Sequence, residues 1–356
     1  MGRVKVGVIG LGEVAQVIHL PILAALSDRF EIAAVCDISP TLVQVIGDRY
    51  GVAHRYDDPV ALTQQADLDA VFVLNSDEYH ADSVVAAAYN HKHVLVEKPM
   101  CLNLNEAQAI IQARDAGGVR VMVGYMRRFA PAFVQAKAML PGLGAIRYAR
   151  IRDIIGRNRL IVDQSSVVLR PDDIPPEMQA ERAERAVNLV EQAIGEAPPD
   201  IVGAYRFLLG LNSHDVSAMR DLLGAPQGVV SARQWNGGRF LVVVFQYEGY
   251  CAVLESGVDE QIRFDAHLEV YGQTTSLRVQ YDSPYIRHLP TTLVVHETRG
   301  DAYEERVLRP TFTDPYTHEI EHFYEVAARG VEPRTPPEDF VEDLRIMRQV
   351  VDAMRL

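Results

Sequence analysis

A glycine-containing turn near the start of the chain constrains the fold more than any other feature. Residues 4–9 (VKVGVI) form a β-rich run, and residues 10–15 (GLGEVA) follow it with the spacing G-x-G-x-x-A, ahead of a helical pattern. Gly10 permits a tight turn, Gly12 lets the backbone approach a phosphate, and the small Ala15 lets the helix pack closely on the strand. Strand, turn and helix in this order predict a βα unit whose helix N-terminus can bind a pyrophosphate.

Strand and helix patterns go on alternating through the first third of the chain. Strands are predicted at 31–36, 70–74, 94–96 and 119–123, and helices at 41–50, 79–90 and 103–116. Several of these strand runs are apolar throughout, which is typical of parallel strands buried on both faces. The alternation therefore predicts an N-terminal doubly wound parallel sheet of the Rossmann type.

Polar residues follow two of these strands. Asp37 comes directly after the run 31–36, where an acid would bind the hydroxyls of an adenine ribose and repel a 2′-phosphate. This position favours NAD over NADP, although Asp37 could instead be a helix cap or turn residue. Asn75 and Ser76 follow the run 70–74, and we assign them to the nicotinamide side of a cofactor cleft; the alternative is a simple loop.

The run 94–96 leads into Glu97-Lys98-Pro99. Pro99 cannot donate to a ladder, so it ends the strand and leaves Lys98 at the carboxyl end, where open α/β sheets bind their ligands. Taken alone, Lys98 would be an ordinary surface lysine, but the turn at 10–15 and Asp37 make a catalytic role plausible.

The rest of the chain predicts a second domain of the α+β type. Alternating runs predict a large, mostly antiparallel open sheet with helices on one face. These strands are expected at 146–151, 229–234, 240–247, 251–257, 267–272, 276–281 and 292–297, with helices at 317–329 and 340–354. We place the domains at 1–127 and 128–356, with a mainly non-strand insertion at about 152–205 that contains a charged helix at 177–194.

The run 241–245 (LVVVF) is apolar on both faces, so its strand should be central or should face a partner subunit. A sheet with helices on one side and a large apolar second face needs covering, which predicts a homodimer or homotetramer through this sheet.

Composition excludes several classes of protein. The formal net charge of -13 argues against nucleic acid or an anionic membrane as the main partner. Three cysteines without CxxC spacing indicate a reducing compartment and no structural metal site, so we expect a cytoplasmic protein. The sequence HEIEH at 318–322 has no third ligand in view, and we interpret it as a solvated helix face rather than a metal site.

Together these motifs resemble the glucose–fructose oxidoreductase/inositol dehydrogenase (Gfo/Idh/MocA) family. The resemblance rests on residues 10–15, Asp37, Glu97-Lys98-Pro99 and the run 124–131 (GYMRRFAP), which is similar to the family's G-x-x-x-R-F-x-P segment. It implies an NAD(P)-dependent oxidoreductase acting on sugars, polyols or their derivatives. It also implies that Lys98 contacts the reacting hydroxyl and the nicotinamide ribose.

The segment 211–217 (LNSHDVS) resembles the family's D-x-G-x-H-x-x-D helix start, which implies that His214 is the catalytic acid/base. The chain departs from this pattern at three positions, Gly210, Asn212 and Ser217. Histidine suits this role because its ordinary pKa is about 6.5. The absence of an acid at Gly210 gives Lys98 more weight, and the alternative for His214 is a place in a helix N-cap region.

We expect the cofactor to contact Gly10, Gly12, Glu13, Val14, Asp37, Ile38, Asn75, Ser76, His80, Glu97, Lys98 and Arg128. Substrate contacts are expected from Lys98, Tyr125, Arg157, Asn212, His214 and Trp235. Arg157 could instead lie in a solvated loop, and Trp235 could belong to the core. The predicted activity is hydride transfer between a sugar or cyclic polyol and NAD. The alternatives are a transient oxidation with bound NAD, giving isomerisation, elimination or glycoside cleavage, and a non-enzymatic NAD-binding sensor.

Overall fold

The computed structural model describes residues 2–355 and divides into two compact units. Unit 1 contains the described residues up to Tyr125 together with Ser166–Gly195 and Glu319–Leu344. Unit 2 contains Met126–Ser165, Glu196–His318 and the described residues from Arg345 onward. The insertion between the two halves of the chain is therefore shared, because its middle part belongs to unit 1.

Unit 1 is built on a six-stranded parallel sheet in the order β3-β2-β1-β4-β5-β6. The strands are β1 (Val4–Ile9), β2 (Phe30–Cys36), β3 (His54–Tyr56), β4 (Ala70–Val73), β5 (His93–Glu97) and β6 (Val121–Gly124). The helices are α1 (Leu20–Ala25), α2 (Pro40–Tyr50), α3 (Pro59–Thr63), α4 (His80–Tyr89), α5 (Leu104–Gly117) and α8 (Pro176–Ile194). A π-helix, η1 (Ala15–His19), precedes α1, and a 3₁₀ turn, η2 (Asp77–Tyr79), precedes α4.

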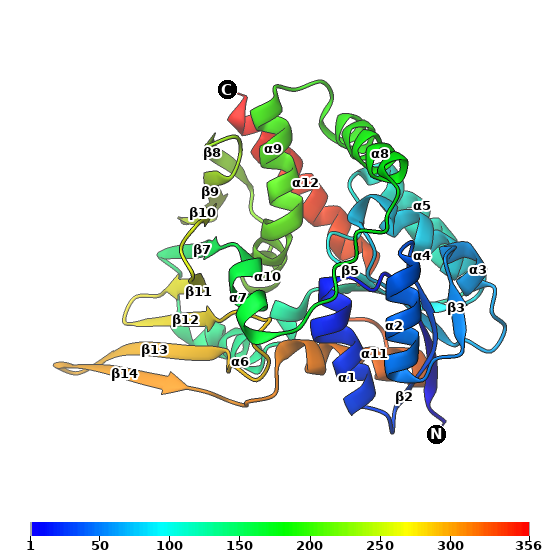
Figure 1. Ribbon diagram of the computed structural model, residues 1–356. Helices are drawn as coiled ribbons and strands as arrows, with labels where there is room; N and C mark the ends of the chain where they lie inside the picture. Colours follow the sequence, from blue (N-terminus) through cyan, green and yellow to red (C-terminus); the bar gives the residue numbers. More distant parts are fainter. Residues whose placement is uncertain (1, 356) are drawn as a thin grey trace. The chain divides into compact units, whose positions relative to one another are not determined.

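The core of unit 1 lies where the apolar runs predicted from the sequence meet their helices. Phe72 on β4 contacts Phe323 of α11 (Pro315–Arg329) with ring centroids 5.3 Å apart, and α4 packs beside β4, β5 and α5. Asn103 caps α5 by accepting from the backbone N–H of Glu106 at 2.9 Å. Figure 1 shows α8 beside α4 and α5, so the charged helix of the insertion completes this unit.

Unit 2 holds an eight-stranded sheet in the order β14-β13-β12-β11-β7-β10-β9-β8, in which only β7 and β10 pair in parallel. Its strands are β7 (Tyr148–Gly156), β8 (Gly228–Trp235), β9 (Phe240–Tyr247), β10 (Tyr250–Asp259), β11 (Phe264–Tyr271), β12 (Thr275–Tyr281), β13 (Thr292–Arg299) and β14 (Ala302–Leu308). Its helices are α6 (Pro131–Met139), α7 (Asn158–Ser165), α9 (Pro199–Phe207) and α10 (Ser213–Leu223), with short turns η3 (Met126–Phe129), η4 (Leu140–Leu143) and η5 (Leu208–Asn212). The last helix, α12 (Pro337–Met354), runs from unit 1 into unit 2.

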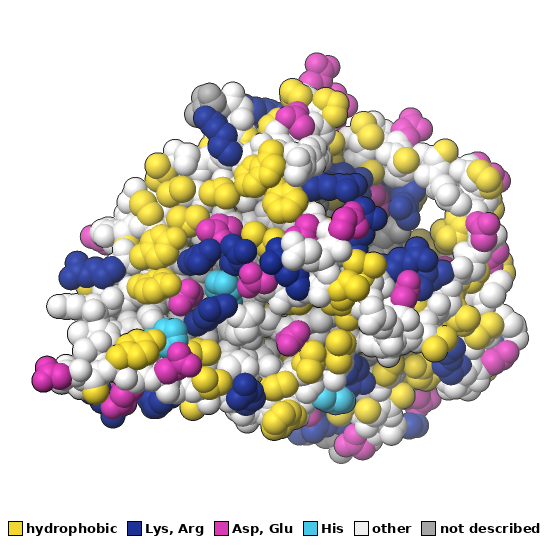
Figure 2. Space-filling view, turned by 60° about the vertical axis from the view of Figure 1, so that its left-hand side comes forward, with side chains coloured by type: hydrophobic (Ala, Val, Ile, Leu, Met, Phe, Trp, Pro, Cys, Tyr) yellow, Lys and Arg dark blue, Asp and Glu magenta, His cyan; other side chains and the backbone are white. Residues whose placement is uncertain are grey.

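Burial alternates along the strands of unit 2. On β7, Ala149, Ile151 and Asp153 are buried, whereas Arg150 and Arg152 between them are half-buried. The buried side faces helices, since α6 lies against β12 and β13 and α10 lies against β7. The other face of the sheet carries mixed apolar and charged side chains, as Figure 2 shows for the side turned forward.

The predicted fold class is confirmed, and the structure corrects four details. The strand at 146–151 extends to Gly156, so the insertion does not begin at Arg152. The strands β3 and β14 were missed, because His54–Tyr56 is too brief and Ala302–Leu308 too polar to give a pattern. The strand at 241–245 is second from the edge rather than central, because β8 lies outside β9, and the alternative that it faces a partner subunit stays a prediction.

Candidate active site

The glycine turn lies at the carboxyl end of β1, beside the end of β4. Gly10 has φ +91°, and a Cβ added to it would lie 2.4 Å from the backbone nitrogen of Asn75. A Cβ on Gly12 would meet nothing within 4 Å. Glycine is therefore required at position 10, because the backbone of Asn75 lies too close for a side chain. Gly12 faces open space, which a phosphate needs when it binds at a helix N-terminus.

Asp37 follows β2 and is bonded to the glycine turn. Its Oδ2 accepts from the N–H of Leu11 at 2.7 Å, and its Oδ1 accepts from the N–H of Ser39 at 2.9 Å. Burial raises the pKa of Asp37, and these two backbone bonds oppose that effect. Ser39 is the N-cap of α2, accepting from Leu42 at 3.1 Å, so Asp37 itself is not the cap; Ile38 between them is exposed.

Asn75 and His80 join the ends of β4 and β5. The ring nitrogens of His80 lie 2.7 Å from the carbonyl oxygen of Pro99 and 2.9 Å from that of Asn75. The amide of Asn75 donates to Ser83 at 3.2 Å, while its Oδ1 is buried and accepts no bond from the residues the structure describes. The ring of His80 therefore contacts two backbone carbonyl groups. The Oδ1 of Asn75 is a buried acceptor to which a bound ligand could donate a hydrogen bond.

Lys98 directly follows β5 and is half-buried. The residue before it, Glu97, is buried and accepts a bond from Nε2 of His19 at 2.8 Å. The second carboxylate oxygen of Glu97 accepts from the N–H of Lys98 at 3.1 Å. The position of Lys98 is therefore fixed by a buried acid–histidine pair, and the carboxylate of Glu97 contacts His19 and Lys98.

A segment of the insertion, residues 166–175, which we call the strap, crosses the same edge of the sheet. The side chain of Gln16 accepts from the N–H of Leu169 at 2.9 Å and donates to its carbonyl at 3.0 Å. Arg170 forms an ion pair of 2.7 Å with Glu13, which follows Gly12. The strap is thus bonded to the glycine turn itself; Val14 is half-buried there.

The helix α8 continues this cover over the end of β4. Arg182 donates to the hydroxyl of Ser76 at 3.3 Å. Arg185 donates to Asp82 at 2.6 Å and lies 4.8 Å from the ring centroid of Tyr79, which is itself bonded to Glu181. The predicted cofactor residues Glu13 and Ser76 are therefore both in contact with the insertion.

In unit 2, His214 lies in the first turn of α10 and is 9% exposed. A buried polar cluster anchors that turn. Arg127 donates to Asp215 at 2.6 Å and to Asp153 at 2.8 Å. Asn212 donates to Asp215 at 2.9 Å and to Ser256 at 2.7 Å.

One cation thus faces two carboxylates in the interior of unit 2. Burial and the charge of Asp153 raise the pKa of Asp215 well above its usual range, although Arg127 opposes this. Burial disfavours the Arg127 cation, but the charges of Asp153 and Asp215 outweigh it and raise the pKa of Arg127. We call these five residues the buried polar cluster: Arg127, Asp153, Asp215, Asn212 and Ser256. Its bonds fix Asn212 and Asp215, which lie before and after His214 in the chain.

The remaining predicted site residues vary in their surroundings. Tyr125 is buried, bonded to Asp343 and stacked on Phe340. Arg128 is buried and pairs with Asp221 at 3.2 Å. Arg157 is exposed and pairs with Glu260 at 2.5 Å, in keeping with the alternative of a solvated loop.

Trp235 and Asn212, both predicted to contact substrate, lie in different surroundings. Trp235 is 45% exposed and stacks on Phe240 with centroids 5.8 Å apart, so it is not a core residue. The amide nitrogen of Asn212 contacts Asp215 and Ser256 inside the cluster, while its Oδ1 is buried and bonded to none of the described residues.

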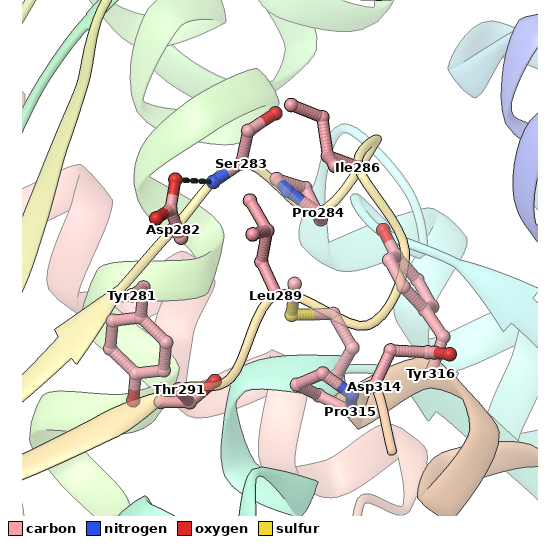
Figure 3. A pocket seen from close by; sticks show the side chains of 11 residues that line it. Tyr281, Asp282, Ser283, Pro284, Ile286, Leu289, Thr291, Asp314, Pro315 and Tyr316 are labelled. Atoms are coloured by element: carbon pink, nitrogen blue, oxygen red, sulfur yellow. Dashed lines mark hydrogen bonds between the residues drawn. The ribbon is translucent and has the colours of Figure 1, made fainter. Parts of the chain in front are cut away.

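The cavities away from the carboxyl ends of the parallel strands do not suit a sugar. One in unit 2, lined by Tyr281, Leu289 and Tyr316 among others, measures about 20 Å³, which is room for roughly one water (Figure 3). A hollow of about 470 Å³ in unit 1 lies at the amino end of β6. Its charges are paired, Arg114 with Glu338 and Arg120 with Glu332, and it is on the opposite edge from Lys98.

The HEIEH helix is not the solvated face predicted from the sequence. His318 and His322 are both half-buried, and His322 accepts from the N–H of Arg334 at 3.2 Å. Across residues 2–355, no three or more His, Cys, Asp or Glu side chains are grouped to hold a metal ion. Among the helices of the same range, none is both long and apolar enough to cross a membrane.

Sequence reasoning missed His19, Gln16, Asp173 and Arg127. His19 had a usable signal, because a histidine within an otherwise apolar helix face behind a glycine turn must have a polar partner when buried. Gln16 and Asp173 gave no such signal, since Gln16 contacts Leu169, 153 residues away, and Asp173 accepts from the N–H of Thr41, 132 residues away.

The parallel sheet, the open glycine turn and the acid after β2 define unit 1 as a dinucleotide-binding domain. Residues 4–125 match the model of the oxidoreductase family with an NAD-binding Rossmann fold, GFO_IDH_MocA. The chain is 27% identical over 337 residues to inositol 2-dehydrogenase of Salmonella typhimurium, covering 93% of this chain and 88% of that protein. It is 25% identical over 338 residues to myo-inositol 2-dehydrogenase of Thermotoga maritima, covering 94% and 91%. Residues 4–125 are therefore similar to the NAD-binding domain of the Gfo/Idh/MocA family of oxidoreductases.

Solved structures share the fold over both units. KijD10, a 3-ketoreductase from Actinomadura kijaniata in complex with NADP and TDP-benzene, superposes with a TM-score of 0.73 at 23% identity, covering 99% of this chain and 97% of that one. The WlbA dehydrogenase from Bordetella pertussis, in complex with NADH and UDP-GlcNAcA, gives 0.72 at 16% identity with the same coverage. These two neighbours hold different dinucleotides.

Proposed function

We propose that the protein is an NAD-dependent dehydrogenase of a sugar or cyclic polyol, with Lys98 and His214 as its acid/base residues. The observation that carries this proposal is the carboxyl edge of the unit 1 sheet. There, open space above Gly12, the acid Asp37 and the lysine Lys98 follow three strands, β1, β2 and β5. Similarity to the inositol dehydrogenases supports the substrate class.

The residues fit the cofactor. Gly12 leaves room for a pyrophosphate, Asp37 offers lone pairs to ribose hydroxyls, and Asn75 offers a buried acceptor. Bound NAD supplies the hydride acceptor. An acid after β2 supports NAD over NADP, because a carboxylate there repels a 2′-phosphate.

Lys98 and His214 are the residues that assist the loss of the proton from the substrate alcohol. The alcohol must lose its proton as its carbon loses hydride, and an ammonium beside the oxygen stabilises the developing negative charge. Lys98 supplies that charge, and His214 takes the proton as general base. Asn75, His80 and the Glu97–His19 pair hold the strand ends around Lys98 in place.

The test is a screen of inositols and pyranoses with NAD, followed by NADH absorbance, on wild type, Lys98→Ala and His214→Asn. Each variant should lower kcat by about a hundredfold or more, the range for a lost acid or base. Lys5→Ala is the matched control, because Lys5 lies on β1 at the opposite edge and pairs with Asp67 at the surface. An undiminished kcat in Lys98→Ala excludes the role of that lysine.

A second candidate is a reaction in which NAD is oxidised and reduced within one turnover and stays bound. The bonds of the strap to Gln16 and Glu13 favour it, because they hold a segment of the insertion beside the turn where the cofactor is proposed to bind. This second candidate predicts that the purified protein contains bound NAD and converts substrate with no net formation of NADH. Rapid exchange of bound NAD with free NAD speaks for the first candidate.

A further inference from the structure

Asp173 on the strap occupies the N-terminus of α2. Its Oδ2 accepts from the backbone N–H of Thr41, in the first turn of that helix, at 3.0 Å. The side chain of Ser39 and the N–H of Thr41 lower the pKa of Asp173, so it carries a full negative charge at neutral pH. A residue more than 130 positions along the chain thus supplies an anion to the helix that follows β2.

A helix N-terminus is a favourable place for an anion, since its free N–H groups and dipole attract negative charge. At α2 the first-turn donors are already used. Leu42 donates to Ser39, and Thr41 donates to Asp173. A phosphate approaching this turn would have to displace a carboxylate that the protein itself provides.

The same turn lies beside Asp37. Ser39 donates its N–H to Asp37 at 2.9 Å, and the charge of Asp173 is among the effects that raise the pKa of Asp37. Two carboxylates from distant parts of the chain are therefore near one another at the end of β2. In a dinucleotide-binding sheet the adenosine ribose, with its 2′ substituent, binds at this position.

We propose that Asp173 is a specificity-determining residue that excludes NADP by occupying the place of its 2′-phosphate. The proposal rests on the dinucleotide-binding function proposed above and adds to Asp37 a second acid, contributed by the insertion. The 2′-hydroxyl of NAD carries no charge for the pair to repel, whereas a phosphate dianion meets both carboxylates and finds the N–H of Thr41 taken.

The variant Asp173→Asn tests this while preserving the fold, because an amide oxygen still accepts from Thr41. Dissociation constants of NADH and NADPH are measured by fluorescence titration at low and high salt. The variant should bind NADPH about tenfold more tightly than wild type, as expected for removing one charge near a phosphate. Its NADH affinity should change far less, and the gain for NADPH should shrink at high salt.

Two further variants show whether the change in dinucleotide preference depends on the position of Asp173. Asp172→Asn removes the same charge from the neighbouring, exposed strap residue and should leave the NADPH/NADH ratio unchanged. Asp37→Asn should raise NADPH affinity independently, so the double variant should gain more than either single one. The inference is overturned if Asp173→Asn leaves the ratio as in wild type, or if Asp172→Asn changes it equally. Wild type that binds neither dinucleotide refutes the proposed function itself, which is a different result.

Discussion

Nε2 of His19 donates to Oε1 of Glu97 at 2.8 Å, so a histidine of the first βα unit holds the residue that precedes Lys98. Both side chains are almost fully buried, at 0% and 7% exposure. Burial acts to raise the pKa of Glu97, but the bond from His19 and the charges of His19 and Lys98 lower it overall. Glu97 is therefore ionised at neutral pH, and its second oxygen holds the backbone of Lys98.

Glu97→Gln should weaken both stability and catalysis. It keeps the shape of the side chain and removes the charge that His19 and Lys98 face, so unfolding in urea should show a loss of about 2 kcal/mol. Because Lys98 loses its anchor, kcat should fall while NADH affinity is nearly kept. Glu248→Gln, at an exposed position in unit 2, is the control and should change neither.

The stability contributed by Glu97 should depend on pH in a defined direction. Its folded-state pKa is lower than its ordinary value of 4.5, so the folded state releases this proton more readily than the unfolded chain does. The contribution is complete above about pH 4.5 and is lost as the pH falls through the folded pKa. The stability difference between wild type and Glu97→Gln should therefore shrink between neutral pH and acid, and a constant difference would refute this assignment.

The two glycines of the turn should respond differently to alanine. In Gly10→Ala the new Cβ would lie 2.4 Å from the backbone nitrogen of Asn75 at a φ of +91°, so the protein should lose stability and NADH binding together. In Gly12→Ala the Cβ meets no protein atom, so the melting temperature should be kept while NADH affinity falls. Calorimetry with fluorescence titration separates the two effects. Normal NADH affinity in Gly12→Ala would show that no phosphate lies there.

Local patterns were sufficient to predict most of the fold. The parallel strands are runs such as Ala70–Val73, and the caps such as Asn103 act within a few residues, so both are visible in sequence. Gly10, Asp37 and Lys98 could be proposed as site residues for the same reason, because each lies within two residues of the end of a predicted strand.

The residues of the candidate site that were not predicted are held by contacts between residues far apart in the sequence. Asp173 is bonded to Thr41, and Arg127 reaches Asp215, and no periodicity in the sequence links either pair. The extension of β7 to Gly156 was missed because Arg152 and Asp153 interrupt its apolar pattern. In the structure these two charges point to opposite faces, Arg152 to Glu255 and Asp265, and Asp153 to Arg127.

Arg127→Met should destabilise unit 2 strongly. It leaves Asp153 and Asp215 buried without their cation, and breaking such a pair typically costs about 3–5 kcal/mol. The loss should be smaller at acid pH, because protonated carboxyls no longer need a counter-charge. Arg157→Met removes an exposed ion pair with Glu260 and should cost less than about 1 kcal/mol. Urea unfolding at pH 8 and pH 5 compares the two variants and the two pH values. Equal losses of unfolding free energy in Arg127→Met and Arg157→Met would contradict the role of the cluster.

The outer face of the unit 2 sheet should mediate self-association. Val244 on β9 and Val253 on β10 are paired in register and half-buried on this face, beside Arg150 and Arg152, which share Glu255. The half-buried apolar side chains of this mixed face are stabilised when a second copy covers them.

Light scattering on wild type should therefore give the mass of a dimer or tetramer. Val253→Glu, which buries an unpaired charge in that interface, should shift the protein to a smaller species without unfolding the chain. Val331→Glu is the control, because Val331 is 42% exposed and belongs to unit 1. A wild type that is monomeric at all concentrations would refute self-association through this face.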